Sequence, residues 1–463
     1  MKGFILISTF VMLFVFHANG QFTQTVTSAD RSFLLKEIEK PVLSSIVTKN
    51  GVPMDTIFIN EKIQYQKMEG FGYTLTGGSA ALLYQLPLQK RKAILNELFG
   101  QGPNDLQINF LRISMGASDL DATIFSYDDL PLGEEDMQLT KMSLANDQQF
   151  LIPLLKEIQK IQPRLKLIAT PWSPPVWMKD NGKTMGGHLL PKFYDTYARY
   201  FVKYIQLMQK EGLEINAVTI QNEPEHGGNN PSMLMSAIEQ TNFIKNHLGP
   251  AFKKQAIATE IVIWDHNADH PNYPIEILND PIAKSFISAS AFHLYLGDET
   301  ALSKVHQAHP DKKIYFTEQW TGAKGNFAGD LMWHMEHIVI GTMANWSSMV
   351  LEWNLANDPQ YGPHTPGGCT ECLGALTVSG TNIQRNISYY IIGQVSKFIP
   401  AGSTRISAQS ANPQIHAIAF TTPANKKVLL VLNQSKELVV TINFEQKKYN
   451  FTLPEKSVST IVW

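Results

Sequence analysis

Short apolar stretches alternate with amphipathic ones through the middle of the chain. Short apolar runs bounded by polar residues are typical of buried strands, whereas apolar residues spaced three and four apart are typical of helices packed on one face. Strands are predicted at Met68–Tyr73, Ile108–Ser114, Leu165–Thr170, Ala217–Asn222, Ala256–Glu260, Ser288–His293, Ile314–Glu318 and Met349–Asn354. Helices are predicted between most of them, at Pro87–Phe99, Gln148–Ile161, Phe193–Gln209 and Asp330–Ile340. Eight such repeats predict an α/β fold, a closed (β/α)₈ TIM barrel.

The pattern changes near residue 400, after a predicted helix at Tyr389–Phe398. Short alternating strands are predicted at Ile415–Thr421, Lys427–Asn433, Leu438–Phe444 and Ser457–Trp463, which favours an antiparallel β-sandwich. Before the barrel, Ser44–Val47 and Thr56–Ile59 also have strand character but are too few to form a stable sheet alone. We therefore expect a barrel domain at 68–385 and a side β-sandwich built from both chain ends, 21–67 plus 386–463.

The first twenty residues have the features of an export signal. Lys2 precedes the apolar stretch Phe4–Phe16, and a small-residue exit follows it. We expect a signal peptide at 1–20, cleavage near residue 20, and a periplasmic or extracellular protein. The apolar stretch is short for a membrane span, and no later segment predicts one.

Composition excludes some classes of partner. The 463 residues carry a formal net charge of −2, with 44% hydrophobic and 17% charged residues. Mixed charges without a long basic run argue against nucleic acid as a partner. We expect a monomer.

The chain has two cysteines, Cys369 and Cys372. In an exported protein the first interpretation is a disulfide, although the spacing also suits a redox dithiol or half of a zinc site, with His364 nearby. His334 and His337 lie three apart on a predicted helix, which differs from the spacing of a zinc peptidase and favours a polar helix face. We expect no metal and no organic cofactor.

Two glutamates end predicted strands. Glu223 follows the fourth strand and precedes Pro224, which restricts it to extended conformations, and Glu318 ends the seventh strand. In a closed barrel these ends face each other across the mouth. Two carboxyl groups that face each other can hydrolyse a glycosidic bond, one acting as acid/base and the other as nucleophile.

Other residues near the predicted strand ends suit a sugar. The aromatic residues there are either core residues or a sugar-binding cleft, and five at one end favour the cleft: Trp172, Trp177, Tyr295, Trp320 and Trp353. Arg112 and Asp119 flank the second strand end, where a buried ion pair could orient a substrate hydroxyl or serve structure alone. The stretch Asp265–Asn267 follows the fifth predicted strand and is a candidate substrate contact, above all through His266.

Several motifs together resemble glycoside hydrolase family 30, which includes glucosylceramidases and microbial β-1,6-glucanases. They are Glu69–Gly72, Leu111–Ser114, Thr170–Lys179, Gln221–Pro224, Thr317–Glu318, Ser396–Pro400 and Lys456–Val458. The resemblance covers essentially the whole mature chain. It implies a retaining double displacement at a β-glycosidic bond, with Glu223 as acid/base and Glu318 as nucleophile. It also implies that Asn222 holds the sugar 2-hydroxyl and that the nonreducing sugar is surrounded by Arg112, Asp119, Trp172, Tyr295 and Trp353.

The expected substrate is β-1,6-glucan, since Gly367–Cys372 resembles the β-1,6-glucanase branch and Leu294 stands where animal glucosylceramidases usually have an aromatic residue. The alternatives are a β-glucosidase acting on glucosylceramide or another β-glucoside, and a xylanase or fucosidase specificity. Outside this reaction class they are a glycan-binding protein on a catalytically dead barrel and an exported metallohydrolase.

Overall fold

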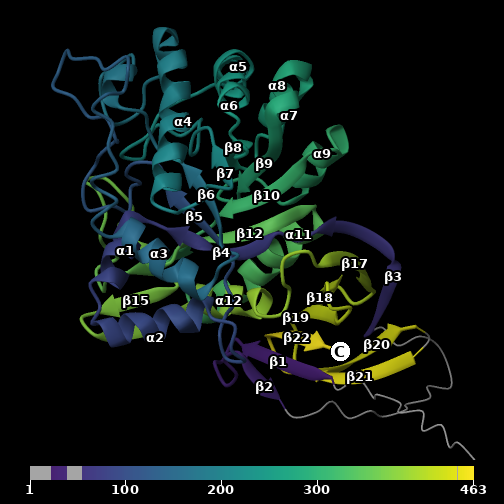
Figure 1. Cartoon of the computed structure of the whole chain (residues 1–463). Coiled ribbons are helices and arrows are strands. Elements are labelled where there is room, and N and C mark those ends of the chain that lie inside the picture. Colours follow the sequence, from purple (N-terminus) through teal and green to yellow (C-terminus); the bar gives the residue numbers. More distant parts are fainter. Residues whose placement is uncertain (1–21, 39–54, 446) are drawn as a thin grey trace, which may run out of the picture.

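The computed structural model describes residues 22–38, 55–445 and 447–463. Eight parallel strands close into a barrel, which confirms the predicted fold class (Figure 1). In chain order they are β4 (Gly70–Leu75), β5 (Phe110–Ser114), β6 (Lys166–Thr170), β7 (Ala217–Thr219), β8 (Glu260–Asn267), β9 (Ile287–His293), β10 (Lys313–Glu318) and β12 (Ser347–Asn354). The expected export signal at 1–20 and the expected strand at Ser44–Val47 lie outside the described residues.

The predicted position of the fifth strand is wrong. Ala256–Glu260 was expected to be extended, but the strand begins only at Glu260 and runs to Asn267. Its second half, Trp264–Asn267, is polar apart from the tryptophan, so the sequence favours a loop there. The pairing with β9 shifts register between Trp264 and His266, so this half is a bulged strand end and carries its polar side chains into the barrel mouth.

The barrel interior is packed with side chains. One buried cluster fills it: Phe110, Ile168, Ala217, Val262, Ala289, Ala291, Tyr315, Met349 and Leu351. Large residues lie beside alanines there, as expected where eight strands converge. Because this level is closed, the strand ends are where a site can form.

Helices cover the outside of the barrel (Figure 1). They are α1 (Gly77–Tyr84), α2 (Leu88–Phe99), α3 (Leu151–Ile161), α4 (Tyr194–Lys210), α5 (Ala237–Phe243), α6 (Gly249–Lys254), α7 (Asn272–Asn279), α8 (Pro281–Phe286), α9 (Thr300–Ala308), α10 (Phe327–Trp333) and α11 (Thr342–Ala344). The helix predicted at Asp330–Ile340 is α10 continued by a π-helical segment, η4 (His334–Gly341). Within the described part of the chain, none of these helices is long and apolar enough to cross a membrane.

Both chain ends contribute to the side domain. Its nine strands are hydrogen-bonded in the order β2-β1-β22-β19-β18-β17-β3-β20-β21. They are β1 (Thr23–Ser28), β2 (Lys36–Ile38), β3 (Thr56–Lys67), β17 (Thr404–Ser410), β18 (Ile415–Thr421), β19 (Lys427–Asn433), β20 (Leu438–Phe444), β21 (Lys447–Leu453) and β22 (Ser457–Val462). The early strand β3 pairs with β17 on one side and β20 on the other. The sequence did not predict β17 and β21, whose residues are largely polar.

The nine strands fold over into two layers. The Gln24 side chain on β1 donates to the carbonyl of Thr452 on β21, although these strands stand near opposite ends of the strand order. Phe22 packs on Tyr449, with ring centroids 4.7 Å apart. The helix α12 (Ile387–Ser396) lies between this domain and the barrel and packs on β1, β4 and β22. Thr460 on β22 donates to Gln394, which fixes the two parts together.

Candidate active site

Glu223 and Glu318 both lie at the carboxyl end of the barrel. Glu318 is the last residue of β10, and Glu223 follows β7 after three residues. Glu223 has the left-handed backbone angle φ +45°, not the extended one that Pro224 favours, and its N–H donates to the carbonyl of Asp265 at 3.0 Å. Backbone strain of this kind is concentrated at functional sites. Both side chains are nearly buried, with 6% and 5% exposed.

Arg112, on β5, lies at the centre of the site. Its guanidinium is fully buried and donates to Glu318 Oε2 at 2.5 Å, to Asp265 Oδ2 at 2.9 Å and to Asn222 Oδ1 at 2.6 Å. The ion pair considered for Arg112 and Asp119 does not form; the ion-pair partners of Arg112 are Glu318 and Asp265. A buried arginine with two hydrogen-bonded carboxylates fixes the orientation of both.

Asp265 lies beneath the site and is held by hydroxyl groups from three strands. They are Thr170 on β6, Thr317 on β10 and the terminal residue of β7, Thr219. The bulge in β8 places Asp265 there, with φ +62°. Burial opposes its ionisation, but the charge of Arg112, the contact with His293 and the Thr317 hydroxyl hold the pKa of Asp265 well below its ordinary value.

His293, the last residue of β9, lies between the two glutamates. Its Nδ1 is 3.2 Å from Glu223 Oε1 and 3.7 Å from Glu318 Oε1, and its Nε2 is 3.2 Å from Asp265 Oδ1. Tyr295 donates its hydroxyl to Glu318 Oε1 at 3.0 Å, and Asn229 donates its amide to Glu223 Oε2 at 3.0 Å. Each glutamate therefore accepts hydrogen bonds at both of its oxygens.

These contacts determine where protons are held in the free cleft. Burial opposes a charge on His293, but Glu318 and hydrogen bonds with Asp265 and Glu223 raise its pKa to about 9. Burial also opposes a charge on Glu223, yet hydrogen bonds with His266 and His293 lower its pKa. The pKa of Glu318 is raised by burial, against the opposing charges of His293 and Arg112. The proton between His293 and Glu223 therefore rests on the histidine at neutral pH.

An open cleft of about 420 Å³ lies above these residues. It is lined by Asp119, Trp172, Glu223, His226, Asn229, His266, Asn267, Tyr295, Leu296, Glu318, Trp320, Trp353, Cys369 and Cys372. Trp172 and Trp353 form one wall, with ring centroids 5.6 Å apart, and the Arg112 guanidinium lies 4.8 Å from the Trp172 ring. Concave sites with aromatic walls and a few convergent polar groups are typical of small-ligand binding.

The loop after β12 closes one side of this cleft. The disulfide is confirmed: Cys369 and Cys372 are bonded. The Cys369 N–H donates to Asp119 Oδ2 at 3.3 Å, and the Thr365 N–H donates to the carbonyl of Asp119 at 2.9 Å. Burial, followed by the charges of Glu318 and Glu223, raises the pKa of Asp119 to about 7. The disulfide-bonded loop thus positions the Asp119 carboxyl group, whose pKa lies near neutrality.

One group of described residues has ligand atoms close enough to hold a metal ion: Glu223, His266 and His293. Both ring nitrogens of His293 already have carboxylate partners, with Nδ1 3.2 Å from Glu223 and Nε2 3.2 Å from Asp265. The helix histidines singled out in the sequence have other partners. His334 contacts Glu352 at 2.8 Å, and His337 contacts Glu299 at 3.3 Å.

Most of the sequence-predicted site residues meet in or directly beneath the cleft, but Trp177 does not. Its Nε1 donates to the carbonyl of Asp128, and its ring packs edge-on against Phe193. Asp265 lies in the stretch predicted to contact the substrate, although it is beneath the cleft, whereas His293 and Asn229 were not predicted as site residues. His293 ends a predicted strand, so its position could have been noticed; Asn229 lies in a loop and gives no such signal.

Comparison with known proteins agrees with this geometry. A family model described as the glycosyl hydrolase family 30 TIM-barrel domain matches residues 68–399, and one described as the family 30 beta sandwich domain matches residues 402–461. The endo-1,6-beta-D-glucanase neg1 of Aspergillus fumigatus is 32% identical over 425 residues, covering 86% of this chain and 85% of that protein. The lysosomal acid glucosylceramidase of Mus musculus is 28% identical over 427 residues, covering 86% and 82%.

A solved structure gives the same result. The endo-beta1,6-glucanase BT3312 superposes with a TM-score of 0.87 at 32% sequence identity, covering 96% of this chain and 100% of that one. Together with the match of the family model over most of the chain, this confirms the resemblance. The chain belongs to glycosyl hydrolase family 30 and is a glycoside hydrolase.

Proposed function

We propose that this protein is an exported, retaining endo-1,6-β-glucanase with Glu318 as nucleophile and Glu223 as acid/base. The observation that carries the mechanism is the position of His293 Nδ1, 3.2 Å from one glutamate and 3.7 Å from the other. The facing carboxylate oxygens therefore lie at most about 7 Å apart, which accommodates the ~5 Å separation of retaining enzymes.

In the first step, Glu318 attacks the anomeric carbon while Glu223 gives a proton to the departing oxygen. Arg112 and Tyr295 hold the two oxygens of Glu318 by hydrogen bonds, which aims the attack. A sugar ring over Glu223 excludes water, which favours its neutral form. The proton on His293 is then close enough, at 3.2 Å, to move onto Glu223.

In the second step, water attacks the glycosyl ester of Glu318. The esterified glutamate carries no charge, so Glu223 can stay ionised and accept a proton from that water. Asn222 accepts from Arg112 through its Oδ1, which leaves its amide hydrogens for a sugar hydroxyl. The product leaves with the same anomeric configuration as the substrate.

The substrate assignment is supported by the relatives, since the neg1 protein and the superposed structure are both named as endo-1,6-β-glucanases. The disulfide-bonded loop at the cleft supports the same substrate, because its sequence resembles the β-1,6-glucanase branch and its Cys369 N–H positions Asp119. A disulfide also supports export, because such bonds persist in oxidising compartments.

The test is digestion of soluble β-1,6-glucan, with products followed by chromatography and proton NMR. Wild-type protein should give a ladder of oligosaccharides with the β-anomer first, and Glu318→Gln should give none. Glu455→Gln, at an exposed carboxylate of the side domain, is the matched control and should act as wild type. Release of glucose from glucosylceramide without glucan cleavage would favour the glycolipid alternative, and initial α-anomer would overturn the retaining mechanism.

A further inference from the structure

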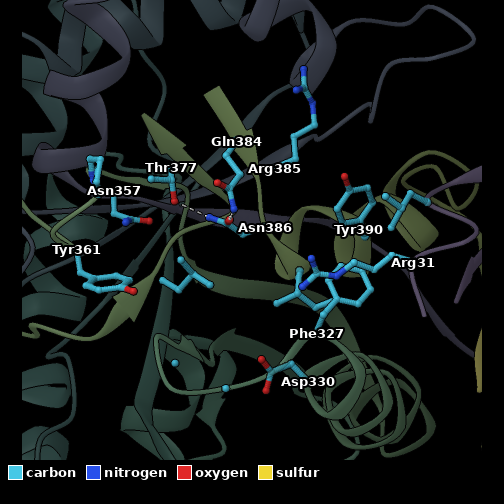
Figure 2. Close-up of a pocket in the computed structure, with 16 residues that line it drawn as sticks. Arg31, Phe327, Asp330, Asn357, Tyr361, Thr377, Gln384, Arg385, Asn386 and Tyr390 are labelled. Atoms are coloured by element: carbon cyan, nitrogen blue, oxygen red, sulfur yellow. Dashed lines mark hydrogen bonds between the residues drawn. The ribbon is translucent and has the colours of Figure 1, made fainter. Parts of the chain in front are cut away.

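A second pocket of about 420 Å³, drawn in Figure 2, has lining residues directly next to those of the catalytic cleft. The two share a wall, the short sheet formed by β11 (Thr321–Gly322) and β14 (Cys372–Leu373). Cys372 lines the catalytic cleft, whereas its neighbour Leu373 and the opposite Gly322 line the second pocket. A chain bound in the cleft therefore passes close to a second cavity of similar size.

Aromatic rings stand on opposite sides of this pocket. Figure 2 shows Tyr361 on one side, and Phe327 and Tyr390 on the other. The rings of Phe327 and Tyr390 lie 5.8 Å apart, and the Arg31 guanidinium lies over Phe327 at 4.6 Å. Flat apolar faces at a pocket rim suit the C–H faces of a sugar ring, and the phenol hydroxyls add polar ends.

The carboxylate of Asp330 is available in this pocket. It is partly buried, and among the described residues no hydrogen bond or ion pair engages it. Burial raises the pKa of Asp330, with a smaller contribution from the charge of Glu352 and an opposing one from His334. A desolvated carboxylate without a partner is costly, and a ligand that donates hydroxyl groups would satisfy it.

The remaining polar lining is held rigidly. Asn386 donates its amide to the carbonyl of Gly374 and to Thr377, both at 2.8 Å. The turn that presents Tyr361 is fixed by Asp358, whose carboxylate accepts from two backbone N–H groups, those of Gln360 and Gly362. The pocket is therefore formed before any ligand arrives, so binding would not require reordering.

We propose that this pocket binds a glucose unit of the β-glucan chain at a distance from the scissile bond. The inference rests on the proposed function, because the ligand is taken to be the polymer that the cleft cleaves. Tyr361 and Tyr390 stack on the sugar ring, and Asp330 accepts its hydroxyls. A second attachment on the same chain raises the local concentration of substrate at the cleft, so polymers gain affinity that short substrates do not.

Kinetics on two substrates test the proposal. Asp330→Ala and Tyr390→Ala should raise KM for soluble β-1,6-glucan three- to tenfold and leave kcat/KM for an aryl β-glucoside within twofold of wild type. Glu455→Gln is the control for loss of a carboxylate elsewhere and should change neither value. An unchanged KM for the polymer in both variants would overturn the proposal. Equal losses on both substrates would do the same, since they indicate damage to the cleft.

A binding measurement separates this proposal from the proposed function. The inactive Glu318→Gln protein, titrated calorimetrically with a β-1,6-linked glucose tetrasaccharide, should show two sites, and the same protein with Asp330→Ala should show one. One site in both proteins refutes the second pocket even if the wild type cleaves the glucan. If the wild type cleaves no β-1,6-glucan, titration with β-1,3- and β-1,4-linked tetrasaccharides decides whether the pocket binds a glucan at all.

Discussion

Replacing His293 by asparagine should remove the pH dependence that its buried charge gives to stability. The side chain contacts Glu223, Asp265 and Glu318, and it is completely buried. Asparagine keeps an amide that can replace the Nδ1 donor but cannot carry a charge. The variant therefore tests the charge of the group more than its volume.

The size of the effect follows from the pKa of His293. Its rise from 6.5 to about 9 corresponds to about 3 kcal/mol that favours the protonated imidazole in the folded protein. Because the folded pKa lies above the unfolded one, this stabilisation is fully present below pH 6.5 and is lost as pH rises to about 9. Wild-type stability should therefore fall across this window.

The assay is unfolding by urea at pH 6 and pH 9.5 for wild type and His293→Asn. Between pH 6 and pH 9.5 the free energy of unfolding should fall by about 3 kcal/mol more in the wild type than in the variant. Asp119 and Lys179, both with a pKa of about 7, titrate in both proteins, so their contributions largely cancel in the difference. An equal loss in the two proteins would refute the assigned charge of His293.

Three further substitutions test the site. Glu223→Gln should lower kcat/KM about 10²–10⁴-fold for poor leaving groups and less for good ones, measured on a series of aryl glucosides; an equal loss across the series would remove Glu223 as the acid. Arg112→Met leaves two buried carboxylates without their cation and should cost about 3–5 kcal/mol of folding free energy, seen in thermal and urea unfolding; a stability within 1 kcal/mol of wild type would contradict this. Cys372→Ser removes the disulfide that fixes the loop whose Cys369 N–H donates to Asp119. KM should then rise about three- to fivefold with kcat nearly constant. An unchanged KM would show that the disulfide does not shape the cleft.

The sequence alone predicted most of the barrel, because a buried strand needs apolar residues whichever neighbour it pairs with. Seven of the eight predicted barrel strands overlap the observed ones closely, and β18, β19 and β20 match to the residue. Glu223 and Glu318 could also be singled out, since each follows an apolar run, and barrel closure places all strand ends at one mouth. Among the strands that the sequence missed or misplaced, β8 accommodates its polar residues at a bulge and β21 begins with exposed lysines. In β17 the polar Arg405 is instead buried against the Tyr65 ring.

The tertiary structure decided which side chains meet. Arg112 contacts Asp265 and Glu318 rather than its chain neighbour Asp119, and His293 lies between two glutamates, because closing the barrel brings β5, β8, β9 and β10 to one mouth. Trp177 is an aromatic residue of the kind that lines sugar clefts, but it packs against Phe193, because the turn after β6 directs its side chain away from the cleft. Local sequence patterns report burial, whereas ion pairs and proton positions depend on distances between residues far apart in the chain, which only the closed barrel determines.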